Sequence, residues 1–338
     1  MGYRAEKLKV ETKVRKVKWI LLSILTVIIL AACIFSAIVP PSTWQYYFST
    51  PDIEERADGE LRMHFLDVGQ GDCSLIEFPN GEVMMIDGGN GSEETSKKIL
   101  RYLNALDIDF IDYLVVTHAD SDHCGSLDTV LEYKEVGIAY LPPVIATYTN
   151  NEYSSFFATL TEQGCKTMFS SRQIILSDEG AYPFTMAFLY PYSLDVTEEA
   201  IQKGKSEDNN AMSSVIWLDY NGASALFMGD APKETEAKLM VDDSLGAFDS
   251  RKVDLSSTEI LKVAHHGSDS SSSLEFLQYL NVKAAVISCG ENNLYGHPTQ
   301  NVLDNLAAVG AGVYRTDKLG NVMITVDKYG ECKQKIVP

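Results

Sequence analysis

The sequence predicts an α/β sandwich preceded by one N-terminal transmembrane helix. From residue 61 onward, short apolar segments alternate with amphipathic segments, as expected when strands and helices alternate along a chain. Motifs rich in histidine, aspartate and glycine stand directly after several of the apolar segments. Because a rigid scaffold places side chains at the ends of core strands, this pattern predicts a functional site at one edge of the sheets.

The N-terminal segment predicts the membrane helix. Basic residues dominate 1–18, and Ile20–Val39 contains no charged residue. About 20 apolar residues span the hydrocarbon core of a bilayer, and a basic flank favours the cytoplasmic side. We therefore predict a cytoplasmic tail over 1–18, a transmembrane signal anchor over 19–40, a linker over 41–60 and one exported domain over 61–338.

Two other interpretations of the apolar segment stay open. Leu30–Cys33 (L-A-A-C) resembles a bacterial lipobox in which Cys33 would carry the lipid, although the apolar run continues beyond it. A cleaved signal peptide is the third interpretation. All three place the domain outside the cytoplasm.

The first half of the domain is predicted to hold strands joined by glycine turns, together with two helices. A D-V-G-Q-G-D turn (67–72) separates the first two strands, and an Asp-Gly-Gly turn (87–89) ends the third. Ser92-x-x-Thr95, followed by apolar residues at helical spacing, predicts the start of a helix. The predicted elements are strands at Met63–Phe65, Ser74–Phe78, Val83–Ile86 and Tyr113–Thr117, and helices at 92–106 and Leu127–Tyr133.

The second half continues the alternation after a stretch with little periodicity. Residues 145–210 are the part with the least clear pattern and are expected to carry loops specific to this protein's relatives. Tyr220-Asn221-Gly222 has the residues of a hairpin turn between two strands. The predicted elements are strands at Ser214–Leu218, Ala223–Phe227, Ile260–Val263, Ala284–Ile287 and Val322–Val326, and helices at Lys233–Met240 and Gln300–Val309.

Composition narrows the possible functions. The 338-residue chain has a formal net charge of −19, which argues against loose, charge-driven binding to nucleic acid. The six cysteines include no C-x-x-C pair, so a structural zinc cluster is not expected.

The histidines point to metal chemistry. Of the six histidines, only His64 lies outside three short polar segments. These segments are T-H-A-D-S-D-H (117–123), A-H-H-G-S (264–268) and Y-G-H-P (295–298), and a further motif, F-M-G-D, ends at Asp230. Histidine is the commonest metal ligand, and carboxylates can join it. The pattern therefore predicts a metal-dependent hydrolase.

These motifs also carry a family resemblance. H-A-D-S-D-H (118–123) is similar to the H-x-H-x-D-H signature of the metallo-β-lactamase superfamily. Together with H-F-L-D-V-G-Q-G-D-C-S-L-I (64–76), L-F-M-G-D (226–230) and L-K-V-A-H-H-G-S (261–268), it resembles the exported hydrolase domain of ComEC-type competence proteins. The resemblance covers about residues 61–328 and implies an αβ/βα sandwich of the metallo-β-lactamase type over 61–338.

The resemblance implies a site for two divalent ions, Zn²⁺ or Mn²⁺. His118 and Asp120 would hold one ion. Asp122 and His123 would hold the other, and Asp230 would bridge the two. His265 is favoured over His266 for the second ion because it comes first after the strand, but the sequence leaves this choice open. The implied ligands are His118, Asp120, Asp122, His123, Asp230 and His265.

Further residues are expected to assist. The candidate catalytic groups are Asp122, His266 and His297. His297 would protonate the leaving group, the other interpretation being a surface turn. Asp87, at the end of an apolar strand, would orient a ligand. Asp72 is expected to bond the backbone of its own turn.

The departures from the signature bear on the metal. Asp120 replaces the second histidine, and the third histidine expected before the strand at Ser214–Leu218 is absent. Asp208, Asn209, Asn210 and Ser213 stand in that region instead. The first ion would therefore have mostly oxygen ligands, which suit Mn²⁺ better than an all-imidazole site does.

We therefore expect an exported, membrane-tethered hydrolase, most simply a phosphodiesterase or DNA nuclease. Alternatives are an esterase acting on a phosphate-linked wall polymer or on phosphorylcholine, a lactonase, and a non-catalytic binding protein with the same fold. The expected partners are the membrane, through the N-terminal helix, and DNA or a wall polymer as substrate.

Overall fold

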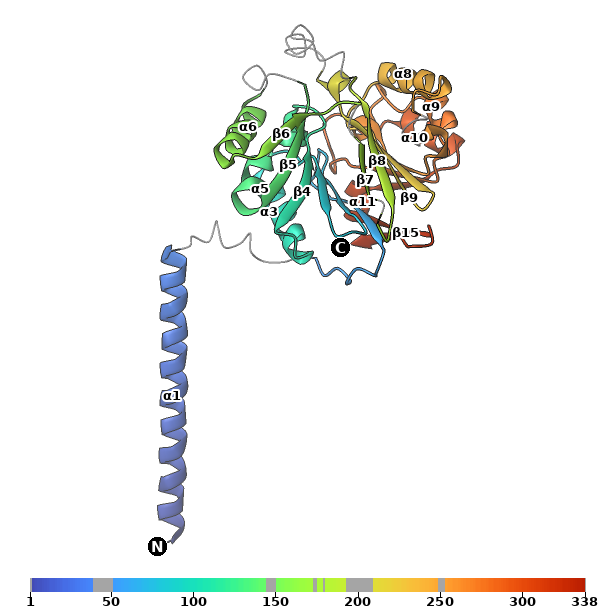
Figure 1. Ribbon diagram of the computed structural model, residues 1–338. Helices are drawn as coiled ribbons and strands as arrows, with labels where there is room; N and C mark the ends of the chain where they lie inside the picture. The colour runs from blue at the N-terminus through green and yellow to red at the C-terminus, as the bar shows by residue number, and fades with distance from the viewer. Residues whose placement is uncertain are drawn as a thin grey trace. The chain divides into compact units, whose positions relative to one another are not determined.

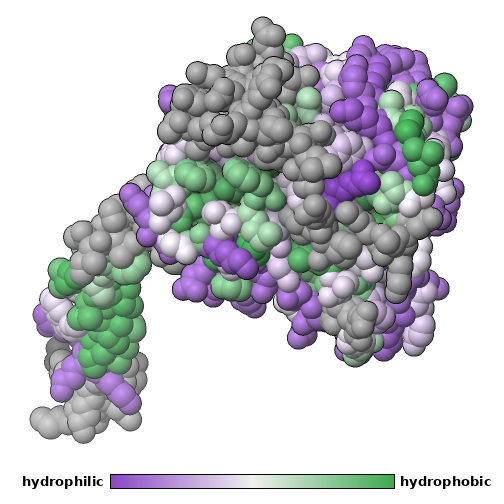
Figure 2. Space-filling model, turned by 45° about the horizontal axis from the view of Figure 1, so that its top comes forward, coloured by the Kyte–Doolittle hydropathy of each residue, from purple (hydrophilic) through white to green (hydrophobic). Residues whose placement is uncertain are grey.

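The computed structural model describes residues 2–38, 51–143, 150–172, 175–178, 180–192, 209–248 and 253–337. The chain divides into two units, Met1–Phe48 and Ser49–Pro338. The first unit contains the helix α1 (Gly2–Ile38). Within α1, Lys13–Phe35 has a mean hydropathy of 2.5, and hydrophobic side chains cover the middle of the helix in Figure 2. By length and composition, α1 is suited to cross a membrane or to act as a signal sequence.

The second unit is built on two sheets. The first sheet has the order β15-β14-β1-β2-β3-β4-β5-β6 and the second the order β13-β12-β11-β10-β9-β8-β7. The strands of the first are β1 (Leu61–Phe65), β2 (Ser74–Glu77), β3 (Val83–Ile86), β4 (Phe110–Val115), β5 (Glu135–Leu141), β6 (Lys166–Phe169), β14 (Asn321–Val326) and β15 (Cys332–Val337). Those of the second are β7 (Ile175–Asp178), β8 (Phe184–Tyr190), β9 (Val215–Tyr220), β10 (Ala223–Phe227), β11 (Ile260–Lys262), β12 (Ala284–Ile287) and β13 (Gly312–Arg315).

The sheets face each other, and helices cover their outer faces (Figure 1). The first sheet is covered by α3 (Glu93–Ala105), α5 (Leu127–Tyr133) and α6 (Asn151–Gln163). The second is covered by α8 (Lys233–Ser244), α9 (Leu274–Tyr279) and α10 (Gln300–Ala308). This arrangement confirms the predicted αβ/βα sandwich.

Two apolar layers hold the sandwich together. Between the sheets, the Phe65 and Phe227 rings stack with centroids 5.9 Å apart, and the Phe78 and Phe184 rings with centroids 4.4 Å apart. The second layer lies under the helices of the second sheet and includes the buried Trp217. Burial of such aromatic rings is a major source of stability.

The central strands bring the polar motifs to one place. Strand β3 pairs in parallel with β4, and β10 pairs in parallel with β11, which itself pairs in parallel with β12. Their carboxyl ends therefore meet at one edge of the sandwich, where open α/β sheets commonly bind ligands. The motifs that the sequence places after strands start from these ends.

The stretch 145–210, for which the sequence predicts loops but no helix or strand, holds regular elements. Its described part contains α6, β6, β7 and β8. Helix α6 has clear caps: Asn150 accepts a hydrogen bond from the Tyr153 amide, and Gly164 ends the helix at φ 67°. Strand β8 is buried along nearly its whole length, so it carries no alternating pattern.

Candidate metal centre

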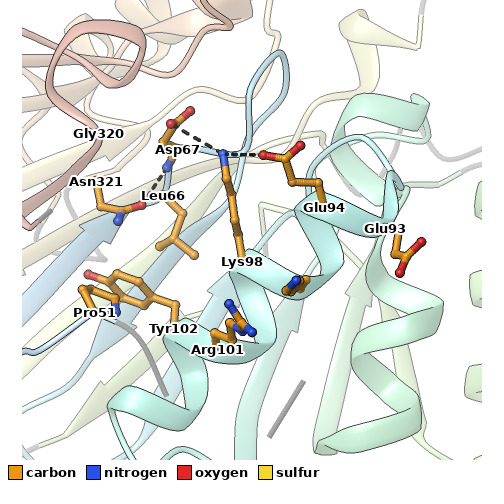
Figure 3. Close-up of a pocket in the computed structure, with 11 residues that line it drawn as sticks. Pro51, Leu66, Asp67, Glu93, Glu94, Lys98, Arg101, Tyr102, Gly320 and Asn321 are labelled. Atoms are coloured by element: carbon orange, nitrogen blue, oxygen red, sulfur yellow. Dashed lines mark hydrogen bonds and ion pairs between the residues drawn. The ribbon is translucent and has the colours of Figure 1, made fainter. Parts of the chain in front are cut away.

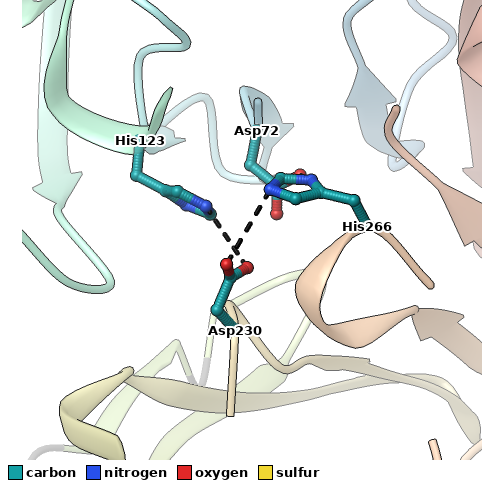
Figure 4. A group of neighbouring side chains, drawn as sticks. All are labelled: Asp72, His123, Asp230 and His266. Atoms are coloured by element: carbon teal, nitrogen blue, oxygen red, sulfur yellow. Dashed lines mark ion pairs between the residues drawn. The ribbon is translucent and has the colours of Figure 1, made fainter. Parts of the chain in front are cut away.

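The polar motifs converge on the carboxylate of Asp230, in the turn that follows β10. Its Oδ1 lies 3.2 Å from His123 Nε2. Its Oδ2 lies 3.7 Å from His118 Nε2, 3.6 Å from His265 Nε2 and 3.8 Å from His266 Nε2. Figure 4 shows His123 and His266 approaching this carboxylate from different loops. Four imidazoles thus point the same ring nitrogen at one carboxylate.

The other ring nitrogen of each histidine is occupied. His123 Nδ1 lies 2.8 Å from Asp87 Oδ2, and His266 Nδ1 lies 3.0 Å from the Ser288 carbonyl oxygen. His265 Nδ1 lies 2.8 Å from Ser270 Oγ. Partners at Nδ1 leave the Nε2 lone pair free for a cation, which is how metal-binding histidines are usually held.

Asp87 anchors the first loop from the end of β3. Its Oδ1 accepts a hydrogen bond from the Thr117 amide at 2.8 Å, and its Oδ2 accepts one from the Thr117 hydroxyl at 2.7 Å. The same carboxylate faces His123. Asp87 therefore holds the loop and the imidazole together, in keeping with the orienting role predicted for it.

The remaining acids flank the cluster on two sides. Asp120 Oδ2 lies 3.6 Å from His118 Nε2, and Asp120 Oδ1 accepts a hydrogen bond from Asn209 at 2.6 Å. Asp122 Oδ2 lies 3.3 Å from His266 Nε2. The two acids of the H-A-D-S-D-H motif thus face different histidines.

The donor atoms fit a divalent cation. Within the part of the chain that the structure describes, His118 Nε2, His123 Nε2, His266 Nε2 and Asp230 Oδ1 are buried without a hydrogen-bond partner. Buried polar atoms rarely lack partners, because each costs desolvation free energy. Nitrogen and carboxylate oxygen atoms that face one another in this way match the ligands of zinc and related ions.

The charge balance points the same way. Burial lowers the pKa of His266, but the carboxylates of Asp230 and Asp72 outweigh burial and raise it to about 10. Burial likewise lowers the pKa of His123, but Asp230 and Asp87 raise it well above its usual value. The buried acids therefore favour positive charge beside them. In the metal-free protein, protons on the histidines supply this charge, and metal cations would supply it by displacing those protons.

The choice between the adjacent histidines differs from the sequence-based preference. His266, not His265, is buried and faces Asp122, and its ring centroid lies 5.3 Å from that of His123. The geometry therefore favours His266 beside the second pair of acid and histidine. Position after the strand could not reveal this, because the left-handed backbone of both residues sets where each ring points.

Asp72 departs from expectation as well. Its carboxylate does not bond its own turn but accepts a hydrogen bond from buried Lys262 at 2.6 Å, and its other oxygen lies 3.2 Å from His266 Nδ1. Although Asp72 lies close enough to join the cluster of ligand atoms, it faces the occupied nitrogen of His266. We therefore assign it to holding that ring. A lysine inside the apolar segment L-K-V (261–263) indicates a buried cation that needs an acidic partner, but it does not identify Asp72 as that partner.

His297 lies at the rim of the site. Its ring lies edge-on to that of His265 with centroids 5.6 Å apart, and it stacks on Tyr295 at 5.7 Å. Asn293 fixes it by accepting a hydrogen bond from the His297 amide at 3.0 Å. Burial, together with His265, lowers the pKa of His297. Asp208 lies outside the described residues.

A separate cavity of about 840 Å³ lies along α3, and none of its lining residues belongs to the cluster around Asp230. Figure 3 shows Lys98 of α3 between two acids, its Nζ 3.7 Å from Asp67 Oδ2 and 3.6 Å from Glu94 Oε1. The charges on this wall are thus largely matched. The cavity lacks the converging imidazoles that mark the candidate centre.

The sequence is similar to those of several known proteins. The family model described as Metallo-beta-lactamase superfamily matches residues 66–197. ComE operon protein 3 of Bacillus subtilis (strain 168) is 29% identical over 281 residues, covering 79% of this chain and 33% of that protein. Competence protein ComA of Neisseria gonorrhoeae is 26% identical over 279 residues, covering 82% of this chain and 34% of that protein. The chain thus spans about a third of the length of these relatives.

One solved structure that aligns with this chain is the metallo-beta-lactamase fold protein YhfI from Bacillus subtilis. It aligns with a TM-score of 0.46 and 9% sequence identity, covering 81% of this chain and 100% of that chain.

Proposed function

Because the chain carries a metallo-β-lactamase domain, we propose that it is a metal-dependent phosphodiesterase that cleaves DNA and is held at the outer face of a membrane by α1. Proteins of this superfamily are generally metal-dependent hydrolases, and relatives of the chain are named as competence proteins. A third relative, from Haemophilus influenzae, is named Recombination protein 2 and is 28% identical over 262 residues. These names favour DNA over a wall polymer.

The observation that carries the proposal is the set of imidazole nitrogens around Asp230. His118 and Asp120 would hold one ion, and Asp122, His123 and His266 would hold the other, with Asp230 shared between them. When bound, a pair of divalent ions lowers the pKa of water toward about 7 and neutralises charge on phosphate oxygens. A single ion would leave some of the converging carboxylates and imidazoles unmatched.

The protein's own groups would prepare the site. Asp87 fixes His123, and Asp72 with the Ser288 carbonyl fixes His266, so these rings keep their orientation during turnover. His297 stands at the rim, where its imidazole would donate a hydrogen bond to a leaving oxygen. Its lowered pKa favours the neutral ring, which suits hydrogen bonding and weighs against the proton transfer expected from the sequence.

A panel of substrates tests the proposal. The full chain in detergent, stripped with chelator and reloaded with Mn²⁺ or Zn²⁺, would be assayed on bis-p-nitrophenyl phosphate, single-stranded and double-stranded DNA, p-nitrophenyl phosphorylcholine and a lactone. We expect metal-dependent cleavage of the phosphodiesters, including DNA. Cleavage restricted to phosphorylcholine esters or lactones would replace the proposal with one of those activities, and no cleavage with either ion would refute it.

A further inference from the structure

The backbone of the two adjacent histidines is unusual. His265 has φ 49° and His266 has φ 53°, so two consecutive non-glycine residues adopt the left-handed conformation. This conformation is rare for L-residues and persists where the surrounding structure holds it, often at functional sites. Its result here is that both rings direct Nε2 at Asp230 Oδ2, at 3.6 and 3.8 Å. An ordinary backbone would send neighbouring side chains in different directions.

The two rings nevertheless stand in different surroundings. His266 is buried, faces Asp122 at 3.3 Å and lies beside His123. The His265 side chain keeps 25% of its surface exposed. Its Nδ1 contacts Ser270 Oγ at 2.8 Å and lies 3.5 Å from Asn210 Nδ2.

Asn210 locates His265 on the side of Asp120. The neighbouring Asn209 donates its hydrogen bond to Asp120 Oδ1. The segment 209–210 thus contacts both Asp120 and His265, and Asp120 in turn faces His118. His118 and His265 approach the same oxygen of Asp230, at 3.7 and 3.6 Å.

We propose that the adjacent histidines serve different ions. His265 is a ligand of the ion held by His118, Asp120 and Asp230, and His266 is a ligand of the ion held by Asp122, His123 and Asp230. His265 thereby supplies the imidazole that the segment before β9 lacks. Ser270, through Nδ1, is a positioning residue for this ligand. The proposal rests on the two-ion centre proposed above, but not on the identity of the substrate.

Metal-binding cycles on the full chain test it. Wild type, His265→Ala and His266→Ala would be stripped and titrated with Mn²⁺ or Co²⁺, with bound metal counted by elemental analysis and Co²⁺ absorption recorded. We expect each single variant to keep one ion near its wild-type affinity and to bind the other at least tenfold more weakly. Circular dichroism of the metal-free variants checks that each remains folded.

Double variants identify which ion each histidine holds. If His265 and Asp120 share an ion, the double variant His265→Ala/Asp120→Ala should weaken the binding of that ion alone. The double variant His265→Ala/Asp122→Ala should weaken the binding of both ions. His266→Ala should show the reverse pairing. Ser270→Ala should weaken the same ion as His265→Ala, but by a smaller factor.

Several results would overturn this assignment. These are unchanged binding of two ions by His265→Ala, coupling of His265 to Asp122 instead of Asp120, and binding of a single ion by the wild type. Two ions with the expected coupling but no cleavage of any phosphodiester would leave the assignment standing and refute only the proposed function.

Discussion

At the residue scale, the buried ion pair between Lys262 and Asp72 helps to hold His266 of the candidate metal centre in place. The Lys262 ammonium is almost fully buried and lies 2.6 Å from Asp72, whose other oxygen faces His266. Burial raises the pKa of Asp72, but Lys262 and His266 outweigh burial and hold it well below its usual value. Asp72 is therefore ionised and depends on both cationic partners.

We predict that Lys262→Met destabilises the metal-free protein by about 3–5 kcal/mol, because it leaves a buried carboxylate without its cation. Urea unfolding of the chelator-treated protein measures the loss. Lys283→Met is the matched control, since the Lys283 side chain is 64% exposed in its pair with Glu259. That control should cost less than about 1 kcal/mol. Equal losses in the two variants would show that burial of the Lys262–Asp72 pair has no special importance.

A second, partly buried pair predicts a pH dependence. His64 Nε2 lies 2.9 Å from Glu77 Oε1, and His64 Nδ1 lies 2.9 Å from the Tyr102 hydroxyl, which agrees with a structural role for this histidine. Burial raises the pKa of Glu77, but His64 and Arg62 outweigh it and lower the pKa below its usual value. The ionised carboxylate thus stabilises the fold above the usual glutamate pKa, and this contribution disappears as the pH falls through the lowered value.

We therefore expect Glu77→Gln to lose about 1.5–3 kcal/mol at pH 7, the range for hydrogen bonds to charged groups. The difference from wild type should shrink below pH 4.5 as the wild-type carboxylate takes up its proton. Denaturant unfolding at a series of pH values would reveal the trend. A difference that is constant from pH 7 to pH 3 would contradict it.

At the element scale, the sequence predicts elements whose ends carry local chemistry. Helix α3 begins after Ser92, which accepts a hydrogen bond from the Thr95 amide as its N-cap pattern predicts. Strands β3, β10 and β12 have the predicted bounds because each is a short apolar run ending in a turn. The sequence of helix α6 does carry a helical pattern, since its buried Tyr153, Phe156 and Leu160 have helical spacing. The sequence of strand β15 carries no alternating apolar pattern, because the strand is mostly exposed.

The site shows the same division between local and distant information. The motif around His118 predicts a cluster, because its acids and histidines lie within one loop. The sequence does not predict the Asp72–Lys262 contact, whose partners stand 190 residues apart. Nor does it predict the directions of His265 and His266, which depend on two backbone torsions. Contacts across the sandwich and the directions of side chains can be identified only from the three-dimensional fold.

The loop between β12 and α10 carries the third prediction. Leu294 is fully exposed and Tyr295 is 71% exposed at its tip, although Asn293 bonds Gly290 and His297 at its base. The Tyr295 ring continues the row of rings from His265 and His297. Given a DNA substrate, a nucleobase beside the cleaved phosphate could stack there, and aromatic stacking contributes about 1–3 kcal/mol per base.

We expect Tyr295→Ala to raise the KM for single-stranded DNA by roughly 5- to 160-fold. Methyl p-nitrophenyl phosphate and an oligonucleotide with abasic positions should respond far less, and Tyr295→Phe should behave like wild type. Tyr329→Ala is the matched control, because Tyr329 is 80% exposed in the turn after β14. Gly330 of the same turn lies close to the β9–β10 turn. That turn is at the opposite end of β10 from Asp230, so Tyr329 is remote from the candidate metal centre. An equal effect on all substrates, or none on DNA, would rule out stacking.

At the scale of the whole molecule, the net charge of −19 and the apolar helix α1 frame the proposed activity. An acidic protein gains little from general attraction to a phosphate backbone. Recognition would therefore depend on cations bound at Asp230 and on uncharged contacts such as Tyr295. Attachment to a membrane would keep such a protein near substrate that passes the cell surface.

The proposed orientation gives the fourth prediction. With the basic residues 1–18 inside, protease added to intact cells should digest the second unit. Cys33→Ser should remain in the membrane fraction if α1 is an anchor, whereas its release would favour lipidation at Cys33. Protection of the second unit until the cells are lysed would contradict the outward orientation.

The number of divalent ions bound per chain tests the central claim most directly. Wild type and Asp230→Asn, both stripped and then dialysed against Mn²⁺ or Zn²⁺, would be analysed for metal and assayed on bis-p-nitrophenyl phosphate. Because every imidazole of the cluster faces Asp230, we predict two ions in wild type. We expect the folded variant to lose at least one ion together with its hydrolysis. Metal-free wild type, or a variant that keeps two ions and near-normal turnover, would contradict a centre built on Asp230.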